Sequence, residues 1–214
     1  MDSQSSRDAA DLFAPRELKP PVDWAAQNCV LRDNVSELPG SLRLFQYAQE
    51  PVNSLVDPTV QKVTLCWGSQ SSKTTSMYAG IAYLLSEFPK DTLWILPSAE
   101  NARNFSKGRW LPFIEDCEPL RAQCPLSAAT GRIDSDKITN MRQEFLSCTL
   151  TFAGAGSENN VKSAPIAYLV LDEIDEIDPD IRLAALERIK GRREYKIIQT
   201  STPKDETGGV WEEY

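Results

Sequence analysis

An apolar run followed by small polar residues and a Lys-Thr pair can bind a phosphate chain, and this sequence has one at 63–74. The run Val63–Trp67 precedes Gly-Ser-Gln-Ser-Ser-Lys-Thr at 68–74. Short side chains let backbone N–H groups surround phosphates in front of a helix predicted over 74–88. Lys73 would reach the β- and γ-phosphates, and the Thr74 hydroxyl would bind Mg²⁺. The predicted nucleotide-binding residues are Gly68, Ser69, Gln70, Ser71, Ser72, Lys73 and Thr74.

The residue before the lysine departs from the usual phosphate-loop pattern, because Ser72 stands where that pattern has glycine. A serine adopts a positive φ only at an energetic cost. Taken alone, the stretch also fits a polar loop that opens a surface helix. A second segment favours the phosphate loop.

That second segment is an apolar strand, predicted over 168–171, which ends in Asp172 and Glu173. Asp172 is suited to hold Mg²⁺ through its water shell, and Glu173 to orient and deprotonate the attacking water. The alternative is a strand that runs into an acidic, solvated turn. We assign that role, as surface charge or helix capping, to the acidic residues that follow: Asp175, Glu176, Asp178 and Asp180.

Two further features fit a nucleotide site. The apolar strand at 195–199 is followed by Thr200, Ser201 and Thr202, which could sense the γ-phosphate. Alternatively, these hydroxyls only cap the end of an ordinary strand where it passes into a loop. Gln46 lies upstream of the phosphate loop, where helicase-like motors place a glutamine that reads adenine. A lone glutamine on a predicted helix is more often a solvated side chain.

The remaining elements follow from periodicity and from Pro and Gly signals. Apolar runs without alternation predict strands covered on both faces. We expect a doubly wound, mainly parallel α/β sheet with helices on both faces, of the P-loop NTPase (ASCE-type) fold, after a short N-terminal helical extension. Residues 1–60 form the arm and leading helices, and 61–214 the core. Other helices are expected at 8–13, 23–28, 42–55, 98–117 (broken at Pro112) and 181–190, a strand at 92–96, and a hairpin of 138–145 with 148–152.

Composition excludes several classes of mechanism. The 214 residues are 41% hydrophobic and contain no histidine, so any general base is a carboxylate and no His-based triad is possible. The five cysteines form no Cys-x-x-Cys pair, which indicates reduced thiols in a cytosolic protein and no zinc site. No apolar run reaches the length of a membrane span.

A net charge of −8 argues against a uniformly basic surface for nucleic acid but leaves room for a local patch. Such a patch could contact DNA through a few basic residues. Four of the six candidates lie around the helix predicted at 181–191, where a solvated helix end is an equally good interpretation. The candidate DNA-contacting residues are Arg132, Lys137, Arg188, Lys190, Arg192 and Arg193.

The order and spacing of several short motifs resemble one family, the large terminase subunit of tailed bacteriophages, in its lambda-like branch. The similarity covers most of the chain. The motifs are Asp23-Trp24, Pro39-Gly40, Asp57-Pro58-Thr59-Val60, Gly68-x-Gln70-x-x-Lys73-Thr74, Pro97-Ser98-Ala99-Glu100, Ser106-Lys107-Gly108-Arg109, 168–175 and Thr200-Ser201-Thr202-Pro203.

The resemblance implies an ATP-driven, Mg²⁺-dependent motor that moves viral double-stranded DNA into a preformed capsid in the host cell cytoplasm. Its implied partners are the DNA, a small terminase subunit and the portal protein, with a ring of subunits as the active form. A C-terminal nuclease domain is expected to be absent from this chain, so nuclease activity is not predicted. An arginine that completes a neighbour's site is expected; Arg109 is the best candidate, with Arg103, Arg142 and Lys162 as alternatives.

Two other functions fit the same residues. A helicase of the Asp-Glu-x-Asp type uses the same sheet and carboxylates, but it would need a second motor domain. A nucleotide-binding assembly module with little turnover fits Ser72, but it would have no need of Glu173.

Overall fold

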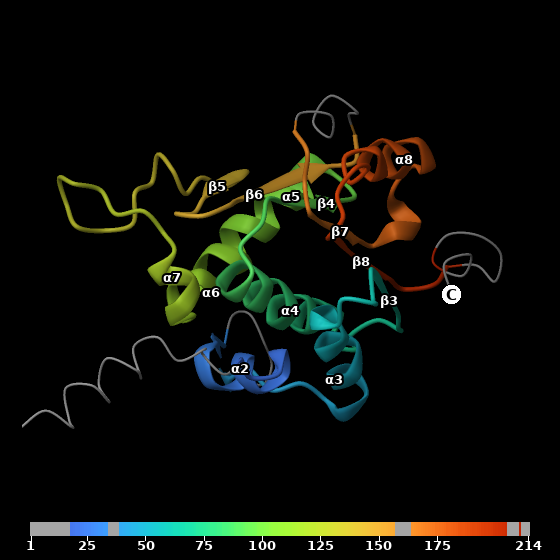
Figure 1. Cartoon of the computed structure of the whole chain (residues 1–214), viewed down its shortest axis with the longest axis horizontal. Helices are drawn as coiled ribbons and strands as arrows, with labels where there is room; N and C mark the ends of the chain where they lie inside the picture. The colour runs from blue at the N-terminus through green and yellow to red at the C-terminus, as the bar shows by residue number, and fades with distance from the viewer. Residues whose placement is uncertain (1–17, 34–38, 157–163, 205–209, 211–214) are drawn as a thin grey trace, which may run out of the picture.

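A six-stranded sheet forms the centre of the molecule (Figure 1). The structure is a computed structural model, and it describes residues 18–33, 39–156, 164–204 and 210. The strand order is β3-β8-β7-β4-β6-β5, and all neighbours are parallel except β5 and β6. The strands are β3 (Lys62–Cys66), β4 (Thr92–Leu96), β5 (Arg142–Glu144), β6 (Thr149–Gly154), β7 (Tyr168–Asp172) and β8 (Lys196–Ser201).

Every residue of the two central strands β4 and β7 is buried. This explains their unbroken apolar sequences, since side chains alternate between the two faces of a strand and both faces are covered. The hairpin expected from 138–152 is present as the antiparallel pair β5–β6, at the edge of the sheet.

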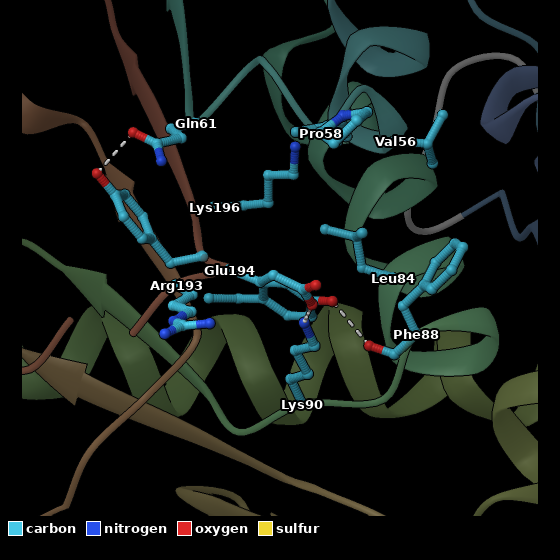
Figure 2. A pocket seen from close by; sticks show the side chains of 12 residues that line it. Val56, Pro58, Gln61, Leu84, Phe88, Lys90, Arg193, Glu194 and Lys196 are labelled. Carbon is cyan, nitrogen blue, oxygen red and sulfur yellow. Dashed lines mark hydrogen bonds and ion pairs between the residues drawn. The ribbon is translucent and has the colours of Figure 1, made fainter. Parts of the chain in front are cut away.

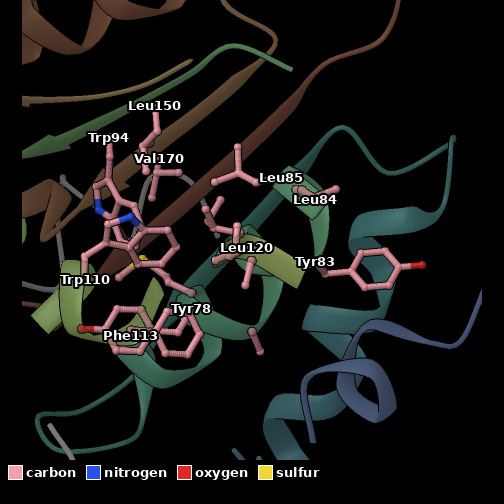
Figure 3. Packing of buried hydrophobic residues seen from close by; sticks show 14 of the residues in the cluster. Tyr78, Tyr83, Leu84, Leu85, Trp94, Trp110, Phe113, Leu120, Leu150 and Val170 are labelled. Atoms are coloured by element: carbon pink, nitrogen blue, oxygen red, sulfur yellow. The ribbon is translucent and has the colours of Figure 1, made fainter. Parts of the chain in front are cut away.

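Helices cover both faces, so the predicted doubly wound architecture is confirmed. On one face lie α4 (Lys73–Glu87), α5 (Ala99–Phe105) and α6 (Leu111–Asp116), and their core contains Trp94, Trp110, Tyr78 and Phe113 (Figure 3). On the other face, α8 (Pro179–Glu187) and the 3-10 turn η4 (Ile174–Glu176) pack on a second cluster that includes Leu93 and Leu169.

The N-terminal extension packs against α4 and contributes to the same core. It comprises α2 (Pro21–Asn28), the short pair β1 (Val30–Leu31) and β2 (Gly40–Ser41), and α3 (Gln46–Asn53). The Trp24 ring packs edge-on against Tyr83 at a centroid distance of 5.5 Å, and its Nε1 donates a 2.7 Å hydrogen bond to Glu87.

The helix expected over 42–55 is shorter than predicted. Leu42 and Leu44 are buried while Arg43 and Phe45 are exposed, which is the two-residue alternation of extended chain rather than the period of a helix. The helix α3 therefore begins only at Gln46, and it ends in the 3-10 turn η1 (Ser54–Val56).

The break expected at Pro112 takes the form of an interruption of the α-helix in the turn just before it. The chain passes from α5 into α6 through a π-helical turn, η2 (Ser106–Trp110). In a regular α-helix the proline ring would collide with the carbonyl four residues earlier and leave it without a donor. The wider π turn removes this conflict, and Pro112 lies in the first turn of α6.

Other boundaries differ by one to four residues, and the largest difference is at β5, which begins at Arg142 rather than at residue 138. The helix α8 begins at Pro179 rather than at residue 181, because the Asp178 side chain caps it by accepting from the backbone N–H of Asp180.

The short helix expected at 8–13 lies outside the described residues. Among the helices that the structure describes, none is long and apolar enough to cross a membrane.

Candidate nucleotide-binding site

Three segments far apart in the sequence meet at the carboxyl ends of neighbouring strands. The strand β8 lies between β3, which leads into residues 68–74, and β7, which leads into Asp172 and Glu173. In the sheet register Cys66 pairs with Ser201, and Asp172 pairs with Thr200. The crevice beyond the carboxyl ends of parallel strands is where ligands bind in open α/β sheets.

The loop at 68–72 has an unusual backbone. Gln70 and Ser72 have φ of 57° and 61°, in the left-handed region that glycine adopts more readily. Ser72 is also the N-cap residue of α4, and its side chain makes no capping hydrogen bond. The first N–H groups of α4 therefore remain available to an anion, and the helix dipole favours negative charge there.

Lys73 is buried and points back into this loop. Its Nζ donates to the carbonyl oxygens of Trp67 (3.0 Å) and Gly68 (2.9 Å) and to Thr202 Oγ1 (2.7 Å). It also lies 4.0 Å from Glu173 Oε1. The ammonium thus bridges the phosphate loop and the ends of β7 and β8.

Asp172 is almost fully buried at the end of β7, where the Thr200 hydroxyl donates a 2.7 Å hydrogen bond to its Oδ1. Burial raises the pKa of this carboxyl to about 6; the hydrogen bond from Thr200 opposes the shift, and the nearby Glu173 adds to it. A nearby divalent cation would favour the ionised form.

Glu173 is held by the end of β8. Its Oε2 accepts hydrogen bonds from the backbone N–H of Thr202 (3.0 Å) and, more weakly, from the Ser201 hydroxyl (3.4 Å). The residue has a φ of 53°, which is uncommon for a non-glycine residue and costs energy. This conformation and its two donors fix the carboxylate beside Lys73.

Asp172 and Thr74 are suited to a Mg²⁺ ion whose other ligands are water and the phosphate oxygens of a nucleotide. Within the part of the chain that the structure describes, no group of three acidic or cysteine side chains could hold a metal by itself. Asp172 offers one buried carboxylate, and Thr74 lies in the first turn of α4. Mg²⁺ in such sites keeps several waters and uses few protein ligands plus phosphate oxygens.

Two aromatic residues that the sequence did not single out border the phosphate loop. Tyr47 Oη donates to the carbonyl oxygen of Ser71 (3.0 Å), its ring packs edge-on against Trp67 (5.1 Å), and Phe45 stacks on it (5.8 Å). Both rings are about half exposed. Gln46 is exposed at the start of α3, between them. A pocket lies beside the loop, lined by Leu31, Ser41, Arg43, Phe45, Ser72 and Thr75.

The basic candidates are scattered. Arg109 is exposed in the π turn η2, and Arg103 is exposed on α5. Arg142 lies on β5, at the sheet edge farthest from the phosphate loop, and pairs with Glu144 (3.1 Å). Lys162 lies outside the described residues.

The DNA candidates fall into two groups. Arg132 and Lys137 lie between α7 (Glu118–Ala122) and β5, and the other four follow or end α8. Arg188 Nε donates to the carbonyl oxygen of Ala164 (2.6 Å), so one of the donor groups of this guanidinium is already used within the protein. The structure does not bring all six together.

Asp175 does not act as surface charge or as a helix cap, contrary to the expectation. Its carboxylate accepts from the backbone N–H groups of Lys204 (3.2 Å) and Val210 (2.6 Å), and its own N–H donates to Ser201 Oγ (3.3 Å). It therefore organises the chain that follows β8. Asp178 is a helix cap, as predicted.

A second pocket lies at the opposite end of the sheet (Figure 2). Leu84 and Phe88, from the far end of α4, form an apolar wall, and Lys90 pairs with Glu194 at 2.6 Å. Of the predicted site residues, only the DNA candidate Arg193 lines it.

The parallel sheet, the phosphate loop and the adjacent carboxylates define the class of P-loop NTPases. More specifically, the chain belongs to the family described as phage terminase large subunit gpA, ATPase domain, which matches residues 36–214. The predicted resemblance is thereby confirmed, and membership does not favour the helicase or assembly-module alternatives.

Two curated relatives are large terminase subunits. That of Enterobacteria phage P21 is 22% identical over 189 residues, covering 86% of this chain and 29% of the relative. That of Escherichia phage lambda is 24% identical over 199 residues, covering 90% and 30%. The chain thus spans less than a third of the length of these relatives.

Solved structures share the fold. The large terminase ATPase domain of Thermus phage P74-26 has a TM-score of 0.52 and 17% identity, covering 72% of this chain and 64% of that one. The large terminase of another thermophilic bacteriophage, in complex with ADP, has a TM-score of 0.50 and 10% identity, covering 75% and 39%.

Proposed function

We propose that this chain is the ATP-hydrolysing motor domain of a phage terminase large subunit, which powers translocation of double-stranded DNA into the procapsid. The proposal rests on one observation above all. Lys73 and Glu173, a hundred residues apart, lie 4.0 Å from each other at the crevice where a triphosphate would bind. Nuclease activity is not part of the proposal.

In the proposed site, the backbone N–H groups of 68–72 and the start of α4 surround the phosphates. Lys73 leaves Thr202 and the loop carbonyls to contact the β- and γ-phosphates. Thr74 holds Mg²⁺ directly and Asp172 through water. When bound, Mg²⁺ neutralises charge on the phosphate oxygens.

Glu173 orients the attacking water and accepts its proton, because it is the carboxylate nearest to Lys73 and is held by the end of β8. Thr200, Ser201 and Thr202 form the sensor. Their contacts to Asp172, Glu173 and Lys73 would change when the γ-phosphate leaves.

The base would lie against Phe45 and Tyr47, whose half-exposed rings offer a stacking surface beside the phosphate loop. Gln46, at the start of the same helix, is placed to read the edge of the base. The pocket bordered by Phe45 and Ser72 would receive the sugar.

The larger assembly follows from the family. We propose a homo-oligomeric ring in the host cytoplasm that engages double-stranded DNA, a small terminase subunit and the portal protein. Arg109, exposed on η2, would complete a neighbour's site. Arg188, Lys190, Arg192 and Arg193 are the proposed DNA contacts, since they lie together at the end of α8.

The test is the ATPase rate of the chain with and without double-stranded DNA, over a range of protein concentrations. We expect Mg²⁺-dependent hydrolysis that DNA stimulates, with a rate per subunit that rises with concentration because sites are shared. A chain that binds ATP but shows no turnover under any of these conditions would contradict the motor function.

A further inference from the structure

One buried side chain joins both ends of the π turn η2. Gln143, on β5, is fully buried; its Oε1 accepts from Trp110 Nε1 (2.9 Å), and its Nε2 donates to Ser106 Oγ (3.3 Å). Ser106 and Trp110 are the first and last residues of the turn, and both are also fully buried. A buried amide without partners would cost several kcal/mol, so a polar residue at this core position requires a reason.

Proline explains only part of this arrangement. Pro112 accounts for the interruption of the α-helical hydrogen bonds, but it does not require a hydrogen-bonded bridge from another strand. Gln143 supplies that bridge across 33 and 37 residues of sequence. The network therefore fixes one shape of the turn among those that proline allows.

The turn presents two cations to solvent. Between buried Ser106 and Trp110, the residues Lys107, Gly108 and Arg109 are all exposed. π-Helical turns are rare, and they occur frequently at functional sites. Guanidinium and ammonium groups on one short turn are suited to bind phosphate oxygens.

The same turn packs against α4, the helix that begins at the phosphate loop. The Tyr78 ring, on α4, stacks on Phe113 (4.8 Å) and contacts Trp110 (5.6 Å) and Phe105 (5.9 Å), as Figure 3 shows in part. Its buried phenol has no hydrogen-bond partner among the described residues. Burial raises the pKa of this phenol, and both Arg109 and Asp172 act on it electrostatically.

We propose that Gln143 is a positioning residue, which fixes η2 so that Lys107 and Arg109 bind a phosphate group outside their own subunit. This inference rests on the proposed motor function. The phosphate belongs either to the nucleotide of a neighbouring subunit or to the DNA backbone, and the two sources are separated by experiment.

The experiment compares Gln143→Leu with the triple variant Ser106→Ala, Trp110→Phe and Gln143→Leu, with Lys107→Ala plus Arg109→Ala as the reference. Gln143→Leu alone leaves two buried groups without partners, so its melting temperature falls. The triple variant removes all three polar groups and so regains part of that loss, while the smaller Phe at position 110 leaves a cavity in the aromatic core.

Two measurements are made on each variant: steady-state ATPase kinetics, and anisotropy of a fluorescent 30-base-pair duplex at fixed salt. If the phosphate belongs to a neighbour's nucleotide, kcat falls by about tenfold to 100-fold in the triple variant, at a temperature where it is folded, while the KM for ATP is unchanged. If it belongs to DNA, duplex affinity falls while ATPase kinetics without DNA are unchanged. In the first case the Lys107→Ala plus Arg109→Ala reference should show the same loss of kcat, and in the second case the same loss of duplex affinity.

Wild-type ATPase and duplex affinity in the triple variant would overturn the positioning role, since the network would then serve only stability. A wild-type chain without ATPase activity, but with the duplex loss in the variants, would contradict the proposed motor function and leave the positioning role supported. A wild-type chain that neither hydrolyses ATP nor binds the duplex would contradict both.

Discussion

The ammonium of Lys73 and the hydroxyl of Thr202 form a 2.7 Å hydrogen bond between segments 129 residues apart. The bond ties the start of α4 directly to the end of β8. Since the backbone N–H of Thr202 also donates to Glu173, one residue contacts both the proposed phosphate-binding group and the proposed general base. If Lys73 binds phosphate as proposed, it has to give up this contact to the end of β8.

This relationship predicts the effect of Thr202→Val, which keeps the N–H to Glu173 and removes the hydroxyl. Lys73 would no longer have to leave this acceptor, so ATP binding should tighten by about tenfold, equivalent to roughly 1.5 kcal/mol for a hydrogen bond to a charged group. Calorimetric titration of ATP measures the change. Thr64→Val, which removes a neutral bond to Gln199, is the control and should leave the affinity unchanged. Weaker binding in Thr202→Val would instead indicate a direct contact between its hydroxyl and the phosphates.

The left-handed backbone of Ser72 predicts a gain in stability. Ser72→Gly removes the cost of a side chain at φ 61° and should raise the free energy of unfolding by about 0.5–1 kcal/mol, after the larger chain entropy of glycine is subtracted. Urea denaturation measures it. Ser69→Gly in the same loop, where φ is not positive, should lower stability instead. A loss of stability in both variants would contradict the proposed strain.

Asp172→Asn should have an effect on stability that depends on pH. Because the pKa of Asp172 is raised to about 6 in the folded chain, the folded state binds its proton more tightly than the unfolded state does. The stability contributed by the protonated form is complete below about pH 4 and declines as the pH rises through 6. Without Mg²⁺, Asp172→Asn should therefore be more stable than wild type by about 2–3 kcal/mol at pH 8.

The same variant should gain no such stability at pH 4, where wild-type Asp172 is protonated. Urea denaturation in EDTA at the two pH values gives the comparison. The variant should also lose Mg²⁺-dependent hydrolysis, since the amide is a poor ligand for the metal. Equal or lower stability of Asp172→Asn at pH 8 would contradict a raised pKa caused by burial of the Asp172 carboxyl.

Arg109 can be tested in mixtures of two inactive proteins. If it completes a neighbour's site, Arg109→Ala retains a whole nucleotide site, and Glu173→Gln retains the arginine. Their mixture should recover part of the wild-type ATPase rate, while each protein alone stays inactive. A mixture of Glu173→Gln with the double variant Arg109→Ala plus Glu173→Gln is the control and should stay inactive. No recovery in the first mixture would exclude Arg109 as the shared residue.

The parts of the site that depend on local order could be predicted from the sequence. Apolar runs identify β3, β7 and β8, and the parallel arrangement of these strands brings their carboxyl ends together, so Lys73 and Asp172 are expected near each other. The departure from glycine at Ser72 also predicts strain correctly, because the loop does require a positive φ there. These features follow from residue type and strand direction.

Other features depend on contacts between distant residues. Both ends of the π turn are hydrogen-bonded to Gln143, which lies more than thirty residues beyond it and has no distinguishing sequence pattern. The two-residue spacing of Leu42 and Leu44 fits extended chain, but over so short a stretch it does not stand out from the helical pattern that follows. Tyr47 does not stand out in the sequence, since an aromatic residue near a predicted helix usually belongs to the core. Only the fold shows that it borders the phosphate loop.

The most direct test of the site compares ATP binding and hydrolysis in wild type and Glu173→Gln. The glutamine can still accept the N–H of Thr202, so the geometry is preserved while the base is lost. We expect the Kd for ATP to stay within about twofold and the turnover rate to fall by about 100-fold or more. Turnover at the wild-type rate in Glu173→Gln would contradict the assignment of the general base and the motor site built on it.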